Sequence, residues 1–295
     1  MNLLQQTDTL QRFIFEHAAV RGEIVHLDAT WRAVLERADY PPLLRDLLGE
    51  MMAAAVLLSA TLKFSGSLVM QMQGSGPIKL LVVECTSDMT MRAIAKWSGE
   101  LHGPDMQTLL GDGRFVMSID RSPEGQQSYQ GIVSLEGSSV AEVLQNYMLR
   151  SEQLDTYLWL AADGSCASGM LLQKLPGKTS EDADAWNRAV QLGSTITHAE
   201  LLALPAVEII HRLYHEEDIR MFEVSPVSFR CSCSRERVSD MLRMLGLAEV
   251  HSILDERGSV EVDCEFCNRH YHFDSVDAEQ LFAADVVAQM NLTRH

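Results

Sequence analysis

The stretches CSCSRERVSDMLRMLG (residues 231–246) and VEVDCEFCNRHYHF (residues 260–273) decide how the end of the chain folds. They hold four of the six cysteines in two tight pairs with 30 residues between them, Cys231 with Cys233 and Cys264 with Cys267. A C-x-x-C turn presents two thiols together, and in an extended C-x-C segment residues two apart point the same way. Zinc takes four soft ligands at the corners of a tetrahedron. The pattern therefore predicts a site in which these four cysteines bind one Zn²⁺ per chain.

Two histidines close behind the second pair leave an alternative ligand set open. His270 and His272 allow a site of three cysteines and one histidine. They flank Tyr271 at the start of an expected strand, so we expect one or both to lie on the surface. A zinc enzyme needs an open coordination position, and four thiolates leave none. We therefore expect no enzyme, no catalytic residues and no further cofactor-binding residues.

The same cysteines predict sensitivity to oxidation. Bound zinc keeps each sulfur as a thiolate, the oxidisable form, and each cysteine has a partner two or three residues away that can resolve a sulfenic acid. A structural zinc contributes on the order of 10–16 kcal/mol to folding, whereas a core this small supplies about 3–5 kcal/mol. Loss of the metal is therefore expected to unfold residues 231–295.

Composition and charge bound the function. Of 295 residues, 46% are hydrophobic and 22% charged, as in globular proteins with a sizeable core. The net charge of -17 repels nucleic acid and anionic membranes, so neither is an expected partner. A zinc-ribbon interaction or nucleic-acid-binding module remains the alternative, and this charge argues against it. No apolar run approaches the about 18 residues that span a bilayer, which predicts a cytoplasmic protein with reduced thiols.

The first 178 residues are expected to form a mixed helix and sheet domain. Residues 1–63 are predicted to be mainly helical after a short extended start, with a long helix opening at Pro41-Pro42. The apolar period then changes to two, which predicts strands. The expected strands are 67–73, 78–84, 91–97, 114–119, 128–135 and 157–161, with a helix over 140–154 capped by Ser138 or Ser139. Short connections favour an α+β fold over a doubly wound α/β fold.

Residues 179–230 are expected to form a helical linker, because acidic charge rises after residue 178. Thr197 and Glu200 fit a capping box that starts a helix, and Pro205 breaks or restarts it. The helix that follows carries an apolar stripe, formed by Val207, Ile210 and Tyr214 with Leu213 beside them. Such a stripe must lie on another apolar surface, and it could cover the first domain.

Residues 231–295 are expected to form a small zinc-binding domain. Ser234 is a good N-cap for a short helix that ends near Gly246, and a second helix ends at Gly258. The remaining expected elements are strands at 260–262 and 271–273 and a last helix over 276–284, capped by Ser275.

Two further sets of residues are interpreted as structural. Cys85 and Cys166 stand alone and are expected to be small buried hydrophobic side chains. Met70 and Met72 lie on one face of an expected strand. Methionines can form a surface that accepts varied apolar partners, but at this regular spacing they are more often part of a core.

Several stretches of the chain resemble the thirty-three-kilodalton heat-shock protein family, a bacterial family of redox-regulated holdase chaperones. The resemblance covers the whole chain, in its length and in its three-part layout. It is carried by FRCSCSRERVSDMLRMLG (229–246), VEVDCEFCNRHYHF (260–273), GSGPIKLLVVE (74–84), YQGIVSLEG (129–137) and YMLRSEQLDT (147–156). The four expected metal positions show no departure from the family pattern.

The resemblance implies a role for each part. Residues 1–178 would bind clients and dimerise, residues 179–230 would be a metastable linker that binds clients once unfolded, and residues 231–295 would be the redox switch. The reduced, zinc-bound protein would be inactive in the cytoplasm until oxidative stress.

The resemblance also implies the switching chemistry. Peroxide or hypochlorite, together with unfolding stress, would form the disulfides Cys231–Cys233 and Cys264–Cys267 and release zinc. The tail and then the linker would unfold and expose apolar surface. A homodimer would then hold unfolding client proteins without ATP, and ATP-dependent refolding chaperones would receive them later.

Overall fold

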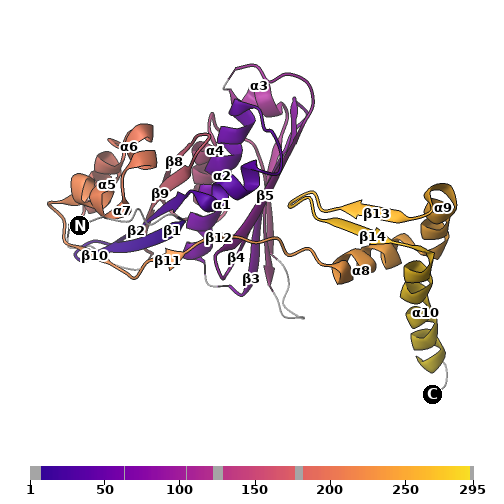
Figure 1. Cartoon of the computed structure of the whole chain (residues 1–295). Coiled ribbons are helices and arrows are strands. Elements are labelled where there is room, and N and C mark those ends of the chain that lie inside the picture. The colour runs from indigo at the N-terminus through magenta and orange to yellow at the C-terminus, as the bar shows by residue number, and fades with distance from the viewer. Residues whose placement is uncertain (1–7, 63, 104, 122–128, 177–181, 293–295) are drawn as a thin grey trace, which may run out of the picture. The chain divides into compact units, whose positions relative to one another are not determined.

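The computed structural model describes residues 8–62, 64–103, 105–121, 129–176 and 182–292 (Figure 1). The chain divides into two compact units, residues 1–230 (unit 1) and residues 231–295 (unit 2), and each is described by itself. Both contain helices and strands, so the predicted α+β class is confirmed. No helix among the described residues is long and apolar enough to cross a membrane.

Unit 1 contains two sheets, which we call sheet A and sheet B. Sheet A has the strand order β10-β1-β2-β9-β8, with β11 also paired to β1, and sheet B has the order β12-β5-β4-β3-β6-β7. In chain order, the elements are β1 (Thr9–Phe15), β2 (Val20–Leu27), α1 (Ala29–Leu35), α2 (Pro42–Thr61), β3 (Gly66–Gln73), β4 (Ile78–Thr86), β5 (Thr90–Trp97), α3 (Met106–Leu110), β6 (Arg114–Arg121), β7 (Tyr129–Ser134), α4 (Val140–Arg150), β8 (Thr156–Ala162), β9 (Ala167–Lys174), α5 (Ala185–Gly193), α6 (His198–Ala203), α7 (Ala206–Tyr214), β10 (Ile219–Met221), β11 (Ser225–Pro226) and β12 (Ser228–Phe229).

The helix predicted to open at the proline pair is the centre of unit 1. α2 begins at Pro42, and twelve of its residues are buried. It contacts strands of both sheets, so it lies between them and forms the main core. A side chain at Gly49 would place its Cβ 2.5 Å from the Cβ of Ala162, so only glycine lets the helix approach the β8–β9 hairpin this closely.

One prediction for this region is wrong. Residues 9–27 form the antiparallel hairpin of β1 and β2 instead of a mainly helical segment. Sheet A is buried on both faces, so its strands lack the alternation of apolar and polar residues by which a strand is recognised. The predicted strands of sheet B are confirmed, and Met70 and Met72 point into the core with no exposed surface.

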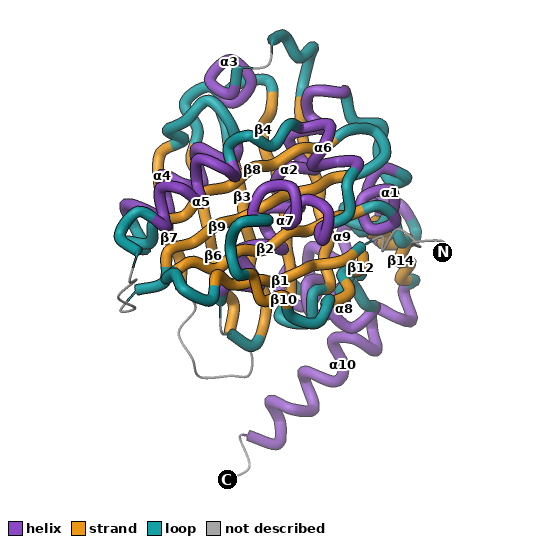
Figure 2. The backbone as a smooth tube through the Cα atoms, turned by 90° about the vertical axis from the view of Figure 1, so that its left-hand side faces the viewer, coloured by secondary structure: helices purple, strands orange, loops and turns teal. Residues whose placement is uncertain are grey.

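The helices α5, α6 and α7, which we call the linker helices, cover the face of sheet A that points away from α2 (Figure 2). The covered strand residues form an apolar surface, which includes Phe13, Phe15, Val20, Ile24, Met170 and Leu172. On the helix side the buried residues are Ala185, Ala189, Leu201, Ile209, Ile210, Leu213 and Tyr214. The Tyr214 ring lies edge-on to that of Phe15 at 5.1 Å. This second core holds the linker helices on the sheet.

The predicted capping box at the start of α6 is confirmed, since Thr197 and Glu200 exchange both hydrogen bonds. The predicted stripe on α7 is partly wrong. Ile210, Leu213 and Tyr214 are buried as expected, but Val207 is 57% exposed and Ile209 is buried in its place. The buried face of α7 is therefore rotated relative to the predicted one.

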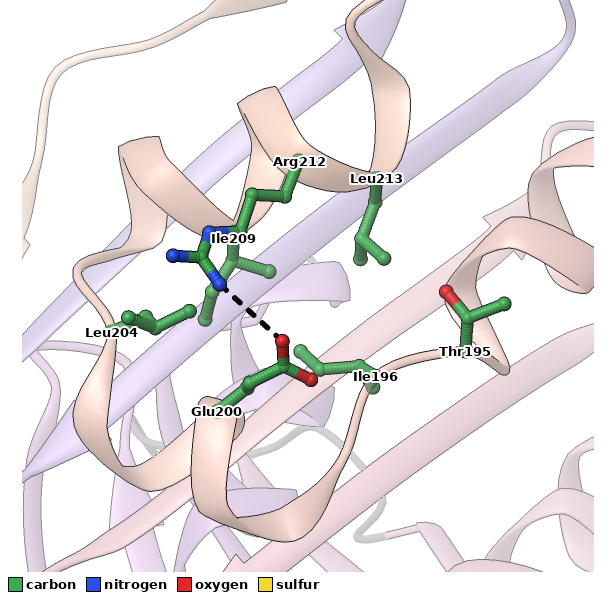
Figure 3. A pocket seen from close by; sticks show the side chains of 7 residues that line it. All are labelled: Thr195, Ile196, Glu200, Leu204, Ile209, Arg212 and Leu213. Atoms are coloured by element: carbon green, nitrogen blue, oxygen red, sulfur yellow. Dashed lines mark hydrogen bonds and ion pairs between the residues drawn. The ribbon is translucent and has the colours of Figure 1, made fainter.

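A small cavity lies between α6 and α7 and is crossed by an ion pair between Glu200 and Arg212, 3.4 Å apart (Figure 3). Its volume of about 190 Å³ is below the about 300–1,000 Å³ of pockets that bind small molecules. Both charged side chains already have protein partners, because Glu200 completes the capping box and Arg212 also pairs with Glu208. We do not assign a ligand to it.

Residues 219–229 form an extended segment, which we call the strap, that joins the two sheets. Its strands β10 and β11 pair with β1, and β12 pairs in parallel with β5. Val227 is buried in the main core, and its N–H donates to the carbonyl oxygen of Asp8 at 2.8 Å. The Arg37 guanidinium lies 4.2 Å from the centre of the Phe229 ring. The strap ends directly before unit 2 in the sequence.

Unit 2 has a small core. Its elements are α8 (Arg235–Leu245), α9 (Leu247–Arg257), β13 (Val260–Asp263), β14 (His270–Phe273) and α10 (Ser275–Leu292). Two of the predicted helix ends are found: the Ser234 hydroxyl accepts the Arg237 N–H, and Gly258 ends α9 in the left-handed conformation. The predicted cap at Ser275 is wrong, because Ser275 is the first residue of α10 and the Asp274 carboxylate accepts the Asp277 N–H instead. The helix predicted over 276–284 runs further, to Leu292. Eight buried side chains form the core, Val238, Leu242, Val250, Val260, Tyr271, Phe273, Ala278 and Leu281.

A buried carboxyl group in unit 1 makes its stability depend on pH. Burial raises the pKa of Glu23 to about 8, which the Arg21 and Arg12 guanidinium groups only partly oppose, and its Oε2 atom has no hydrogen-bond partner. Between the ordinary carboxyl pKa and about 8, the folded protein keeps a proton that the unfolded chain has lost. Stability therefore falls as the pH rises through this window. Burial raises the pKa of Glu50 to about 7, with Asp46 adding to the effect, so Glu50 acts in the same direction.

Glu23→Gln is expected to remove most of this pH dependence. Glutamine has the shape of the protonated acid, so the free energy of unfolding of the variant relative to the natural chain should rise between pH 5 and pH 8, by an amount on the order of a few kcal/mol. Urea unfolding at the two pH values measures the difference. Glu216→Gln is the control, because that side chain is 86% exposed. Equal pH profiles for Glu23→Gln and the natural chain would contradict the prediction.

Candidate metal centre

The four cysteines of unit 2 come together from two segments. Cys231 and Cys233 lie in the extended stretch before α8, whose start is fixed by the Ser234 cap. Cys264 and Cys267 lie in the turn that joins β13 to β14. All four are half-buried and free of disulfides. Each segment therefore supplies one of the predicted pairs.

The second pair is held by a tight turn. The carbonyl oxygen of Cys264 accepts the N–H groups of Cys267 and Asn268, at 3.2 and 2.7 Å, while the Cys264 N–H donates to the carbonyl oxygen of Arg269 at 2.9 Å. Asn268 has a φ of 57°, in the left-handed region that asparagine tolerates better than most residues. Both thiols of the turn are thereby placed on one side of it.

The distances between the sulfur atoms fit a metal ion. The Sγ atoms of Cys231 and Cys264 lie 3.6 Å apart, those of Cys233 and Cys267 lie 3.4 Å apart, and all four lie within 4.8 Å of one another. Sulfur atoms about 2.3 Å from a central zinc in a tetrahedron would be about 3.8 Å from each other. The four cysteines can therefore hold a metal ion with little movement.

The thiols differ in how readily they ionise without a metal. Burial raises the pKa of Cys264, and raises that of Cys267 to about 12. At Cys233 burial acts in the same direction, but hydrogen bonds from the Tyr271 hydroxyl and the neighbouring thiols outweigh it and lower the pKa to about 7. Thiolates this close repel one another, so a bound cation is what would let all four ionise together.

The surroundings fix the position of the strand that follows the turn. Arg235 donates to the carbonyl oxygen of His272 at 2.8 Å, pairs with Asp277 at 2.8 Å and lies over the ring of Phe273. Cys233 and Cys264 also pack against the core of unit 2. The thiol cluster and the small core therefore form one structural unit.

The other candidate residues lie apart from the cluster. His270 and His272 are exposed, as predicted, and the Nδ1 atom of His270 lies 2.8 Å from the Asp263 carboxylate. Cys85 is fully buried in unit 1, as predicted. Cys166 is only half-buried, contrary to the prediction, because it lies in the exposed turn between β8 and β9. The geometry thus favours the four-cysteine site over one with a histidine.

Tyr271 contacts the cluster and was missed as a functional residue. Its hydroxyl donates to the Cys233 sulfur at 3.1 Å. In the alternating sequence His-Tyr-His-Phe of β14, Tyr271 and Phe273 point into the core and the two histidines point outward. That alternation is the signal in the sequence that could have placed Tyr271 beside the cysteines.

Comparison with known proteins gives the family. The family model described as Hsp33 protein matches residues 8–274. The 33 kDa chaperonin of Methylobacillus flagellatus is 54% identical over 294 residues, covering 99% of this chain and 100% of that protein. The 33 kDa chaperonin of Chromobacterium violaceum is 54% identical over 289 residues, covering 98% of each. This chain belongs to the Hsp33 family. Membership supports a chaperone function, as the resemblance implies.

The fold is also that of an Hsp33 protein. The crystal structure of the 33 kDa chaperonin (heat shock protein 33 homolog) of Thermotoga maritima superimposes with a TM-score of 0.81, covering 95% of this chain and 99% of that one. The sequences share 22% identity, so this likeness concerns the fold alone.

Proposed function

We propose that this Hsp33-family chain is a redox-regulated, ATP-independent holdase that is inactive while its four cysteines bind zinc. One observation carries the proposal: the sulfur atoms of Cys231, Cys233, Cys264 and Cys267 lie within 4.8 Å of one another. Such a cluster is a tetrahedral zinc site when reduced and a pair of disulfides when oxidised. Bound zinc would hold the four sulfurs as thiolates and tie the two segments together.

The oxidation step is balanced by peroxide. Two thiols lose two electrons and two protons and form one S–S bond, while one hydrogen peroxide is reduced to two water molecules. We propose the pairs Cys231–Cys233 and Cys264–Cys267. Each disulfide removes two thiolate ligands, so the oxidised cluster can no longer hold zinc.

Unit 2 depends on this cluster for its stability. Its core is small, with eight buried side chains. Three of them are the two aromatic residues of β14 and a leucine of α8. A core of this size supplies about 3–5 kcal/mol of folding free energy. Bound zinc contributes more, about 10–16 kcal/mol. Oxidation is therefore proposed to unfold unit 2.

Unfolding of unit 2 would reach the linker helices through the chain itself. The strap ends at Phe229, two residues before Cys231, and β12 holds it by the N–H groups of Ser228 and Arg230 donating to the carbonyls of Met89 and Met91. These backbone hydrogen bonds pair the C-terminal end of the strap with sheet B. Once they open and β10 and β11 also separate from β1, the linker helices would lose their C-terminal anchor. The apolar face of sheet A that they cover would then become available to clients.

We also propose the partners and the cellular location of this chain. The active form would be a homodimer in the cytoplasm that holds unfolding proteins and passes them to ATP-dependent refolding chaperones. The first 178 residues would bind clients and dimerise, and residues 179–230 would bind clients once unfolded. The charge of -17 would keep a client-loaded protein soluble and away from nucleic acid.

The test combines metal content with holdase activity. The purified reduced chain is expected to hold one zinc and to leave the thermal aggregation of citrate synthase unchanged. After warm peroxide treatment it should hold less than about a tenth of a zinc per chain and should suppress aggregation without ATP. Zinc-free, oxidised protein that leaves aggregation unchanged would refute the proposal.

Mass mapping of the oxidised chain tests the disulfide pairing separately. In the reduced cluster, sulfur contacts of 3.6 and 3.4 Å run between the pairs, from Cys231 to Cys264 and from Cys233 to Cys267. Local disulfides would therefore require each pair to rearrange after the metal leaves. Disulfides across the pairs, or ones that include Cys85 or Cys166, would contradict the mechanism.

A further inference from the structure

The hydroxyl group of Tyr271 is placed to control how one sulfur of the cluster reacts. It donates a hydrogen bond to the Cys233 Sγ atom at 3.1 Å. The Tyr271 residue is 7% exposed and belongs to the core of unit 2, where β14 pairs with β13 and sets it opposite Val262. Because the ring packs in this core, the hydroxyl is kept beside the sulfur.

Arg269 orients this hydroxyl. Its guanidinium lies close enough to the Tyr271 hydroxyl and to Cys233 and Cys267 for its positive charge to act on all three. Because a guanidinium is positive and has no acceptor, it favours the orientation in which the phenol oxygen faces Arg269 and the hydroxyl hydrogen points to the sulfur. Arg269 therefore strengthens the hydrogen bond that Tyr271 donates to Cys233.

The sulfurs of the other pair are supported in a different way. The backbone N–H groups of Phe266 and Cys267 hydrogen-bond the Cys264 sulfur, and that of Arg269 bonds the Cys267 sulfur. Those bonds are part of the turn and cannot be removed without breaking it. The bond to Cys233 comes from a side chain and can be removed by deleting one oxygen atom.

We propose that Tyr271 is a positioning residue that slows the oxidation of Cys233, and so helps to set the oxidant level at which the cluster opens. A hydrogen bond to a thiolate draws electron density from the sulfur, and the thiolate is the nucleophile that attacks peroxide. In that attack an S–O bond forms and the O–O bond breaks. The sulfur becomes a sulfenic acid, and the hydroxide that leaves takes up a proton and becomes water. This inference rests on the proposed redox function.

The experiment compares Tyr271→Phe with the natural chain, both full-length and zinc-loaded. Each is exposed to a series of short hydrogen peroxide pulses and quenched, and the loss of each thiol is measured by isotope-coded alkylation and mass spectrometry. In Tyr271→Phe the initial rate at Cys233 is expected to rise about three- to tenfold, because the attacking sulfur loses only part of this hydrogen bond as its charge decreases in the transition state. The initial rate at Cys264 should change less than about twofold.

Phe273→Leu is the matched control. Phe273 lies on the same strand, points into the same core and is 2% exposed. Its truncation should loosen unit 2 and raise the initial rates of all four thiols together. Arg269→Met keeps the tyrosine but removes the positive charge that orients its hydroxyl, and it should raise the rate at Cys233 about twofold. This variant decides the question if Tyr271→Phe fails to retain zinc.

An unchanged Cys233 rate in Tyr271→Phe, or a uniform rise like that of Phe273→Leu, would overturn the inference. The readout is thiol modification and not client protection. A chain that shows the Cys233 effect but never suppresses aggregation would therefore refute the proposed function and leave the role of Tyr271 standing.

Discussion

Replacing Cys264 by serine is expected to abolish zinc binding and to unfold unit 2 while unit 1 keeps its fold. The serine hydroxyl is a poor zinc ligand, and the remaining three thiols cannot complete the tetrahedron. A structural zinc contributes about 10–16 kcal/mol to folding, and the variant loses most of this free energy. The core of eight side chains cannot replace it. Zinc content, and the dispersion of amide signals in NMR spectra, measure the two effects.

Cys166→Ser is the matched control for this prediction. Cys166 is also a half-buried cysteine, but it lies in unit 1 and outside the thiol cluster. The variant should bind one zinc and keep unit 2 folded. A folded, zinc-free unit 2 in Cys264→Ser would show that the small core suffices by itself, and oxidation could then not act by unfolding.

Replacing Ile209 by aspartate is expected to make the reduced, zinc-bound chain active as a holdase. Ile209 is 1% exposed and belongs to the core between the linker helices and sheet A. A carboxylate there loses the apolar contacts and buries an unpaired charge, which costs at least about 3 kcal/mol. That is enough to detach α7 from the sheet and expose its apolar face. Suppression of citrate synthase aggregation, bis-ANS fluorescence and limited proteolysis within residues 182–218 should all rise without oxidant.

The control lies two residues away on the same helix. Val207 is 57% exposed, so Val207→Asp introduces the same charge without disturbing the core. It should remain inactive until oxidised. If Ile209→Asp detaches the linker helices but gives no activity, the covered face of sheet A is not the client surface. If the two variants behave alike, charge and not burial is responsible.

Unit 2 could be predicted closely from the sequence, because its signals are local. Ser234, Gly246 and Gly258 mark helix ends by the chemistry of capping, and cysteines two or three residues apart mark a metal site by their spacing. The capping box of α6 and the α+β class of unit 1 were predictable for the same reason. Sheet B was predictable because its outer face is partly polar, so its strands alternate.

The errors arise where a remote partner decides the structure. β1 and β2 have buried residues on both faces, because α2 covers one face of sheet A and the linker helices cover the other. Such strands cannot be told from a buried helix by periodicity alone. The strands of the strap are two or three residues long and exist only by pairing with β1 and β5. On α7, Val207 and Ile209 are equally apolar, and only the position of sheet A decides which is buried.

The strap has a consequence for the opened molecule beyond the uncovering of apolar side chains. It supplies the outermost pairing of both sheets, since β10 and β11 hydrogen-bond to β1 and β12 hydrogen-bonds to β5. If residues 219–229 leave, β1 and β5 become edge strands, each with a row of unpaired backbone N–H and C=O groups. Such edges accept extended chains of any sequence, because the backbone is common to all of them. An unfolding polypeptide would therefore meet, on the opened chain, two templates for strand addition beside an apolar face.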